Sequence, residues 1–479
     1  MNYKLVFKTI GKLLQVQAAF LVIPLLFSFI SQENISYSYI IPIAILLVFS
    51  FLLSFLKTGE SKFYAKDGIA TVGLAWIILS LFGALPFVLS GTLPNFVDAI
   101  FESSSGFTTT GSSVINNIET TYKSIQIWRS LTIWVGGMGI LVFVIAIQPK
   151  NNSRAIYLLK AESTGPSVGK LTSKITLSAR ILYLIYIGLT LILFILLLFK
   201  IPFFDSLNYA LSTAGTGGFG IHNNSIGHYA DVYVEAVITV FMILFGISFN
   251  VFYLILIGNV KQALKSEELR VYLVIFISVS ILIAINTIGM YTNFMEALRY
   301  SSFQSASIMT TTGYSTTNFN SWPELSKWLL IILMFIGGSA GSTAGGMKVS
   351  RIIIYFKTVI KEIKYSIHPN RISIITFEGK PITESMSKGV FAYLATYILI
   401  LIFGVLIISI DGYDIATNFT ATLSSISNVG PGLGAVGPAN NYSIFSSFSK
   451  VVLSFIMIVG RLELFPILIL FSPKLYKNN

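Results

Sequence analysis

Four short turns in this sequence share a composition that suits the binding of a desolvated monovalent cation. Each contains glycine beside threonine, serine or asparagine; they read Thr109-Thr110-Gly111-Ser112, Gly215-Thr216-Gly217-Gly218, Thr311-Thr312-Gly313-Tyr314 and Asn428-Val429-Gly430-Pro431. A cation that leaves water needs a cage of oxygen dipoles without fixed full charges, and backbone carbonyls supply such dipoles. Glycine permits a backbone conformation that a Cβ would oppose, so that the carbonyls can point inward.

The turns predict a K⁺ site with oxygen ligands. We expect the ion-binding residues to be Thr109, Thr110, Gly111, Thr216, Gly217, Thr311, Thr312, Gly313, Asn428, Val429 and Gly430. We expect K⁺ to lie at the carbonyls of Thr110, Gly111, Thr216, Gly217, Thr312, Gly313, Val429 and Gly430.

The spacing of the turns predicts an internal repeat. Glycines 111, 217, 313 and 430 are separated by 106, 96 and 117 residues. Before each turn lies a segment too short to span a membrane, at about 95–108, 203–213, 296–309 and 413–426, and apolar spans flank each unit. Irregular backbone at membrane depth is tolerated only where it lines a water-filled cavity or is buried in protein. Four re-entrant half-helices around one pore are therefore expected. The alternative is four ordinary glycine turns between spans.

A glycine-rich stretch in the third unit predicts a break in a membrane helix. Each glycine costs about 1 kcal/mol relative to alanine within a helix. The stretch ends in a cation, Lys348, and a second cation, Arg461, lies in the apolar run 451–472. We expect Arg461 to lie near the carbonyls of segment 337–347 and to hold that segment in place. Close packing of helices on small residues is the alternative. The residues concerned are Gly337, Gly338, Ser339, Gly341, Gly345, Gly346, Lys348 and Arg461, and a family resemblance given below implies that they form a gate.

Composition places the chain in the membrane. Of its 479 residues, 54% are hydrophobic and 11% charged, which is too little charge to cover a soluble domain of this size. We expect an all-α integral membrane protein with about ten transmembrane helices. Because the chain has no cysteine, we expect no disulfides, zinc sites, iron–sulfur clusters or thiol chemistry. The three histidines, His222, His228 and His368, fall in polar connections, so no histidine metal site is expected within the membrane.

The basic residues alternate by loop, which sets the predicted topology. One side holds 24 of the 32 Lys and Arg, in the N-terminus, 57–67, 149–180, 259–270, 351–388 and the C-terminus. The positive-inside rule makes that side cytoplasmic, with both termini inside. The net charge of +12 therefore does not indicate nucleic-acid binding. The other side has more acids than bases. That excess either draws cations to the pore or only reflects the depletion of bases, and both interpretations stay open.

Three stretches resemble the Trk/Ktr/HKT superfamily of cation transporters. They are Thr310-Thr311-Thr312-Gly313-Tyr314, Asn428-Val429-Gly430-Pro431-Gly432-Leu433-Gly434 and Gly460-Arg461-Leu462-Glu463. Extra spans at about 13–31 and 38–56 favour the longer members over the shorter KtrB. The second turn departs from Thr-Thr-Gly, since Gly215 precedes Thr216, and one quadrant of the filter is therefore expected to be looser.

The resemblance implies a complete architecture. It implies four M1–P–M2 potassium-channel-like repeats preceded by two extra helices, and an intramembrane gating loop at 337–347. The expected units are 1–66 (two N-terminal helices), 67–178 (repeat 1), 179–268 (repeat 2), 269–387 (repeat 3, with the gating loop) and 388–479 (repeat 4).

The resemblance also implies function and partners. It implies K⁺ uptake across a bacterial plasma (inner) membrane, a cytoplasmic nucleotide-binding regulatory ring subunit (TrkA-like), a homodimer, and no bound cofactor. An ion-coupled K⁺ or Na⁺ symporter with broken helices is the alternative function, and it would show inverted two-fold repeats. A membrane protease is disfavoured because no histidine is expected at membrane depth beside Ser339, so no enzyme is expected.

Overall fold

Six helices are long and apolar enough to cross a membrane. The computed structural model describes residues 2–56, 64–139, 175–369 and 374–473. About 20 residues at 1.5 Å each cover roughly 30 Å of hydrocarbon, and six helices among the described residues meet that test. They are α1 (Tyr3–Ile30), α2 (Tyr37–Ser54), α3 (Ala65–Gly83) continued by α4 (Leu85–Leu89), α9 (Ile175–Leu198), α14 (Glu267–Thr287) and α18 (Glu384–Ile408).

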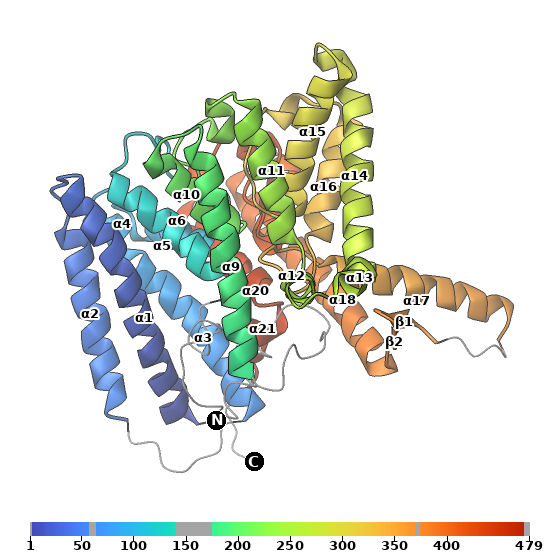
Figure 1. Cartoon of the computed structure of the whole chain (residues 1–479). Helices are drawn as coiled ribbons and strands as arrows, with labels where there is room; N and C mark the ends of the chain where they lie inside the picture. Colours follow the sequence, from blue (N-terminus) through green and yellow to red (C-terminus); the bar gives the residue numbers. More distant parts are fainter. Residues whose placement is uncertain (1, 57–63, 140–174, 370–373, 474–479) are drawn as a thin grey trace.

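Four shorter helices enter from one end of the bundle. We call the end where α1 begins the basal end and the end where α1 finishes the apical end (Figure 1). The short helices have 12 to 16 residues, too few to span. Asn95, Asn293 and Asp414 cap three of them through side-chain oxygens. The predicted half-helices are thus present, as α5 (Phe96–Phe107), α10 (Phe203–Ala214), α15 (Phe294–Met309) and α19 (Ile415–Ser427).

The second helix of each repeat stops or bends near the middle of the bundle. α11 (Val232–Gly246) meets α12 (Phe249–Leu256) at 93°. α16 (Glu324–Ile336) is separated from α17 (Val349–Ile367) by the glycine-rich loop, and α20 (Ser447–Arg461) from α21 (Phe465–Leu470) by a short break. α6 (Lys123–Gly137) is the corresponding helix of repeat 1. These breaks explain why fewer helices pass a length test than the ten spans expected.

The remaining elements are small connections. Residues 376–381 form an antiparallel hairpin at the basal end, β1 (Thr376–Phe377) with β2 (Lys380–Pro381), in which Thr376 pairs with Pro381 and Phe377 with Lys380. The others are α13 (Val260–Leu264) and the 3₁₀ turns η1 (Ser225–His228), η2 (Ile288–Met290), η3 (Phe319–Ser321), η4 (Ser409–Asp411), η5 (Gly434–Val436) and η6 (Tyr442–Ile444).

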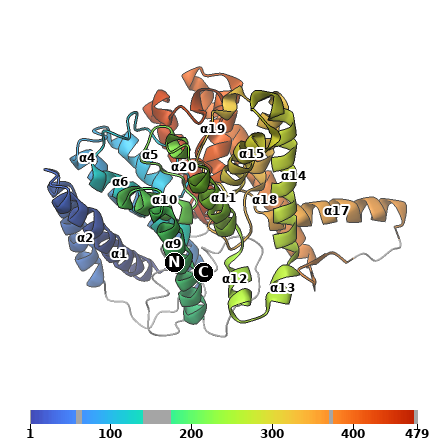
Figure 2. The same ribbon diagram turned by 45° about the horizontal axis from the view of Figure 1, so that its top comes forward.

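The repeats close into a ring. Each second helix packs against the half-helix of the following repeat: α6 against α10, α11 against α15, α16 against α19, and α20 against α5. The last contact joins repeat 4 to repeat 1. The two N-terminal helices lie outside this ring, where α1 packs on α2, α3 and α6. In both views α17 leaves the ring and projects sideways at the basal end (Figures 1 and 2).

The expected repeat divisions lie close to helix starts. Those at 66/67, 178/179, 268/269 and 387/388 fall near the start of α3, α9, α14 and α18. Ser266 and Thr383 cap α14 and α18, so these two helices begin in polar sequence before the apolar run starts.

Candidate functional site

The four turns have the same backbone conformation. Each half-helix is followed by a residue in the left-handed region, with φ of 57° at Thr109, 53° at Thr216 and 57° at both Thr311 and Asn428. Two residues later comes a glycine that also has positive φ. These glycines are Gly111 (79°), Gly218 (66°), Gly313 (84°) and Gly430 (107°).

This common conformation corrects the predicted register of the second turn. Gly217 was expected to match Gly111, but Gly218 takes that place and Gly217 matches Thr110. The second turn therefore differs from the other three in having glycine, Gly217, at its middle position. Gly215 is the C-cap residue of α10. Gly218 was missed because the turns were aligned on their first shared glycine. Counting two residues from the left-handed residue would have found it.

The turns meet in a closed ring of carbonyls. Each positive-φ glycine lies against the carbonyl of the middle residue of the next turn, which we call the middle carbonyl. The space between them is too small for a Cβ, so only glycine fits at this position. The contacts run from repeat 1 to 2, 2 to 3, 3 to 4 and back to 1. A Cβ on Gly111 would lie 1.9 Å from Gly217 O, and a Cβ on Gly218 would lie 1.8 Å from Thr312 O. A Cβ on Gly313 would lie 2.3 Å from Val429 O, and a Cβ on Gly430 would lie 2.8 Å from Thr110 O.

Seven of the eight predicted carbonyl ligands lack a hydrogen-bond donor within the described part of the chain. A buried carbonyl without a donor is unfavourable, and a cation or water would satisfy it. Gly430 differs, because its oxygen accepts from Ser112 Oγ at 3.1 Å, Ser424 Oγ at 2.7 Å and Tyr442 OH at 2.8 Å. Gly430 O is thus engaged within the protein, which sets it apart from the other seven predicted ligands.

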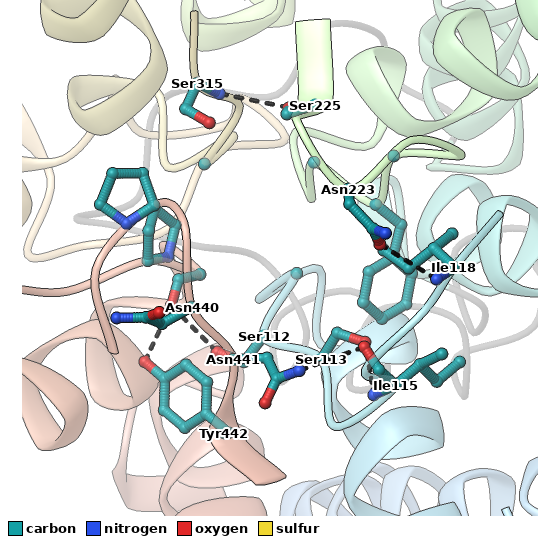
Figure 3. A pocket seen from close by; sticks show the side chains of 18 of the residues that line it. Ser112, Ser113, Ile115, Ile118, Asn223, Ser225, Ser315, Asn440, Asn441 and Tyr442 are labelled. Atoms are coloured by element: carbon teal, nitrogen blue, oxygen red, sulfur yellow. Dashed lines mark hydrogen bonds between the residues drawn. The ribbon is translucent and has the colours of Figure 1, made fainter. Parts of the chain in front are cut away.

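A cavity of about 360 Å³ opens above the ring at the apical end. It contains one positive-φ glycine from each repeat, and Figure 3 shows loops of different repeats around it, with Asn223 bonded to Ile118. No carboxylate side chain lines it among the described residues. Two apical acids have other roles: Asp414 caps α19, and Asp98 pairs with Lys450 at 2.7 Å.

A buried ion pair behind the ring joins repeats 1 and 2. Glu102 of α5 pairs with Arg129 of α6 at 2.8 Å, and both side chains are about 1% exposed or less. Arg129 also donates to Gly220 O at 3.0 Å and lies over the Phe219 ring at 4.1 Å. Removing one member of such a pair leaves an uncompensated buried charge. Sequence reasoning missed this pair, since neither residue stands out in its helix.

The glycine-rich loop lies against the basal side of the turns. Gly337, Gly341 and Gly346 have φ of 70°, 71° and 74°, and Lys348 has 78°. The loop is hydrogen-bonded to repeats 2 and 4 and to its own repeat 3, and Arg461 of repeat 4 bonds both the loop and repeat 1. Its contacts are Ser339 N to Gly246 O (2.9 Å), Gly345 N to Thr311 Oγ1 (2.7 Å), Gly346 N to Ser427 O (2.9 Å), and Arg461 to Thr343 O (2.9 Å), Gly136 O and Gly137 O (2.6 Å each).

The charged residues near the loop have the partners that their burial requires. Arg461 lies at the loop carbonyls, as expected from the sequence. Glu463, two residues on, pairs with Arg351 at the start of α17. Lys348 is 2% exposed, and its Nζ donates to Ala344 O within the loop itself. The loop is thus closed on itself by Lys348 and attached to its surroundings by Arg461. Gly338 also belongs to it, with an added Cβ meeting Ala344 at 2.5 Å.

A carboxylate that sequence reasoning missed attaches the loop to α14. Glu268 is 4% exposed, and its Oε1 accepts from Ala340 N at 2.7 Å and from Ser350 N at 3.1 Å. Glu378, at the tip of the β1–β2 hairpin, in turn accepts from Ser266 Oγ at 2.8 Å and Glu268 N at 3.0 Å. The chain from hairpin to α14 to loop is therefore continuous. Acids in the first turn of a helix are common, so nothing in the sequence marked Glu268.

Comparison with known proteins gives one family. The model of the TrkH family, described as "Cation transport protein", matches residues 35–478. The chain is 33% identical to the Trk system potassium uptake protein TrkH of Salmonella typhimurium over 88% of both chains. It is 30% identical to that of Escherichia coli K12 over 100% of both. The crystal structure of the potassium transporter TrkH from Vibrio parahaemolyticus matches with a TM-score of 0.90 and 29% identity, over 100% of both chains.

The tether made by Glu268 can be tested by amide hydrogen exchange. Glu268→Ala removes the acceptor of two buried amides, and hydrogen bonds to charged groups contribute about 1.5–3 kcal/mol. Exchange at Ala340 and Ser350 should then rise roughly ten-fold or more. The matched control is Glu267→Ala, which removes the adjacent carboxylate that pairs with Lys357. Equal exchange in the two variants would show that Glu268 does not hold the loop.

Proposed function

This chain belongs to the TrkH family of cation transport proteins, and we propose that it takes up K⁺ through the ring formed by its four turns. It is a multi-pass membrane transporter, not an enzyme, and K⁺ is its transported ion. The observation that carries the proposal is the closed ring of middle carbonyls, each held against a positive-φ glycine of the neighbouring repeat. Neutral oxygens in a ring replace the hydration shell of K⁺ without trapping the ion as a carboxylate would.

The half-helices add a favourable potential for a cation at the ring. The C-terminal end of a helix carries roughly half a negative charge. All four half-helices end immediately before a turn, at Phe107, Ala214, Met309 and Ser427. Since no carboxylate lines the cavity among the described residues, these dipoles and the free carbonyls are the main attraction for K⁺. Four half-helices entering from the same end also disfavour a transporter with inverted repeats.

The proposed orientation places the cavity outside the cell. Among the described residues, basic side chains gather at the basal end, at the start of α1, between α12 and α14 and along α17, and the positive-inside rule assigns that end to the cytoplasm. In a bacterial inner membrane K⁺ would enter the apical cavity, pass the ring and meet the glycine-rich loop. Both termini would be cytoplasmic.

The loop at 337–348 is the proposed gate. It lies on the basal side of the ring and is bonded to the third and fourth turns, so an ion leaving the ring would meet it. Arg461 acts as its latch through Thr343 O. Small-residue packing alone does not account for a loop that is hydrogen-bonded to repeats 2 and 4.

A regulatory subunit would act at the basal end. The hairpin, through Glu378, contacts the start of α14, and Glu268 then contacts the loop. A cytoplasmic nucleotide-binding ring that moved the hairpin or α17 would thereby shift the gate.

α17 also exposes Phe356, Val359, Ile360 and Ile363, which a second copy of the chain in a homodimer would cover.

The ring assignment predicts unequal effects at adjacent glycines. Gly218→Ala places a Cβ 1.8 Å from Thr312 O at a φ of 66°, so the ring must open. Gly217→Ala meets only the Ile133 side chain, at 2.8 Å or more, away from the ring. Competition of Na⁺ with Rb⁺ uptake should show at least about a ten-fold loss of preference for Gly218→Ala, equivalent to 1.4 kcal/mol, and a smaller loss for Gly217→Ala. A larger loss of preference for Gly217→Ala than for Gly218→Ala would indicate that Gly217, as first expected from the sequence, is the residue that corresponds to Gly111.

The gate assignment predicts that removing the latch raises flux. Arg461→Ala deletes the donors to Thr343, Gly136 and Gly137, and deletion of Ser339–Ser342 shortens the loop itself. Both should increase K⁺ flux per folded molecule and leave ion preference unchanged, because the turns are intact. Losing one partner of a buried charge pair can cost roughly 3–5 kcal/mol, so flux is normalised to the monodisperse fraction. Arg299→Ala, which breaks the apical pair with Glu235, is the control. Lower flux from both folded gate variants would refute the gate.

A further inference from the structure

A cluster of potential metal ligands lies at the rim of the apical cavity. Glu119 comes from the segment that follows the first turn, and His222 and His228 come from the segment that follows the second. One ligand atom from each of the three lies within 4.8 Å of the others. His222 also lines the cavity, and its side chain is 19% exposed. The cluster thus joins two repeats at the entrance to the ring.

His222 lies between two carboxylates. Its Nδ1 lies 3.5 Å from Glu119 Oε1 and its Nε2 lies 3.8 Å from Asp205 Oδ2. Both nitrogens are buried, and neither makes a hydrogen bond. An imidazole nitrogen and a carboxylate oxygen are both ligand atoms for divalent transition metals.

The surroundings hold this arrangement in place. Asn223 bridges the two segments, because its backbone N donates to Glu119 Oε1 at 3.3 Å and its side-chain Oδ1 accepts from Ile118 N at 3.1 Å. Tyr229 OH donates to Asp205 Oδ2 at 2.6 Å. These contacts fix Glu119 and Asp205 on opposite sides of His222.

His228 has the freedom to complete the site. Its ring is stacked on that of His222, with centroids 3.6 Å apart and planes 5° from parallel. Two imidazoles bind one metal ion through lone pairs in their ring planes, which parallel stacked rings cannot both direct at the same point. His228 is exposed, so its ring can turn out of the stack without disturbing packed residues.

We propose that Glu119, His222 and His228 bind a divalent transition metal, with Zn²⁺ the best match. Two imidazoles and a carboxylate with an open fourth position form a recurrent Zn²⁺ ligand set, and imidazole also suits Cu²⁺ and Ni²⁺. Bound metal would crosslink the apical segments of repeats 1 and 2. It would also place two positive charges at the cavity mouth and reduce K⁺ entry. The binding stands on the cluster alone, whereas this inhibition rests on the proposed function.

Binding is tested first, without any transport. Purified full-length protein is titrated with Co²⁺ as a spectroscopic substitute for Zn²⁺, and the visible absorption of protein-bound Co²⁺ is followed until Zn²⁺ displaces it. His222→Gln, His228→Gln and Glu119→Gln should each weaken Co²⁺ binding at least about ten-fold. His368→Gln removes an exposed imidazole at the end of α17 and should change nothing. Co²⁺ binding that is absent, or insensitive to the three substitutions, overturns the proposal.

Inhibition is tested second, by Rb⁺ uptake into proteoliposomes with Zn²⁺ on the apical side. Wild type and His368→Gln should be inhibited, and the three site variants should resist. Rb⁺ uptake is also measured against pH with a metal chelator present. If the three site variants shift that pH dependence and none of the proteins binds Co²⁺, the cluster binds a proton rather than a metal ion, and the metal site is refuted. If Co²⁺ binds as predicted but the chain carries no K⁺ or Rb⁺, the metal site stands and the proposed function fails.

Discussion

Backbone carbonyls that lack donors at membrane depth are the constraint on which the rest of the structure depends. Such groups are costly in a bilayer unless protein, water or an ion satisfies them. Here they are gathered at one level, where the turns of four repeats meet. A single turn of this kind would be a defect in a span. Four in a closed ring form the cation site that we propose, in which the neighbours of the ion are uncharged oxygens.

The surrounding elements can be understood as supports for that ring. Short helices bring the chain to mid-depth and end at left-handed residues, and each second helix packs against the next half-helix so that the ring closes. The pair of Glu102 and Arg129 holds the first two turns from behind. Below the ring the broken third repeat supplies a loop whose tethers, Arg461 and Glu268, come from different repeats.

The sequence predicted what depends on local composition and failed where distant residues decide. The half-helices were placed within about two residues, because their length and polar caps are local signals. The contact of Arg461 with the loop was also expected. Gly218 was missed because backbone conformation, not residue type, defines the register. The oxygen of Gly430 accepts a hydrogen bond from Ser112, which lies 318 residues away in sequence. Glu268 bonds Ala340 across 72 residues, and no local pattern encodes such a pairing.

The central claim is that the middle carbonyls of the four turns bind the transported ion, and a crystal structure with bound Rb⁺ tests it most directly. Anomalous scattering locates Rb⁺ without assuming a ligand set. We expect a peak on the axis of the ring, equidistant within error from the carbonyl oxygens of Thr110, Gly217, Thr312 and Val429, with Gly430 O still bonded to its three hydroxyl donors. A peak coordinated by Gly430 O, or peaks only outside the ring, would contradict the account.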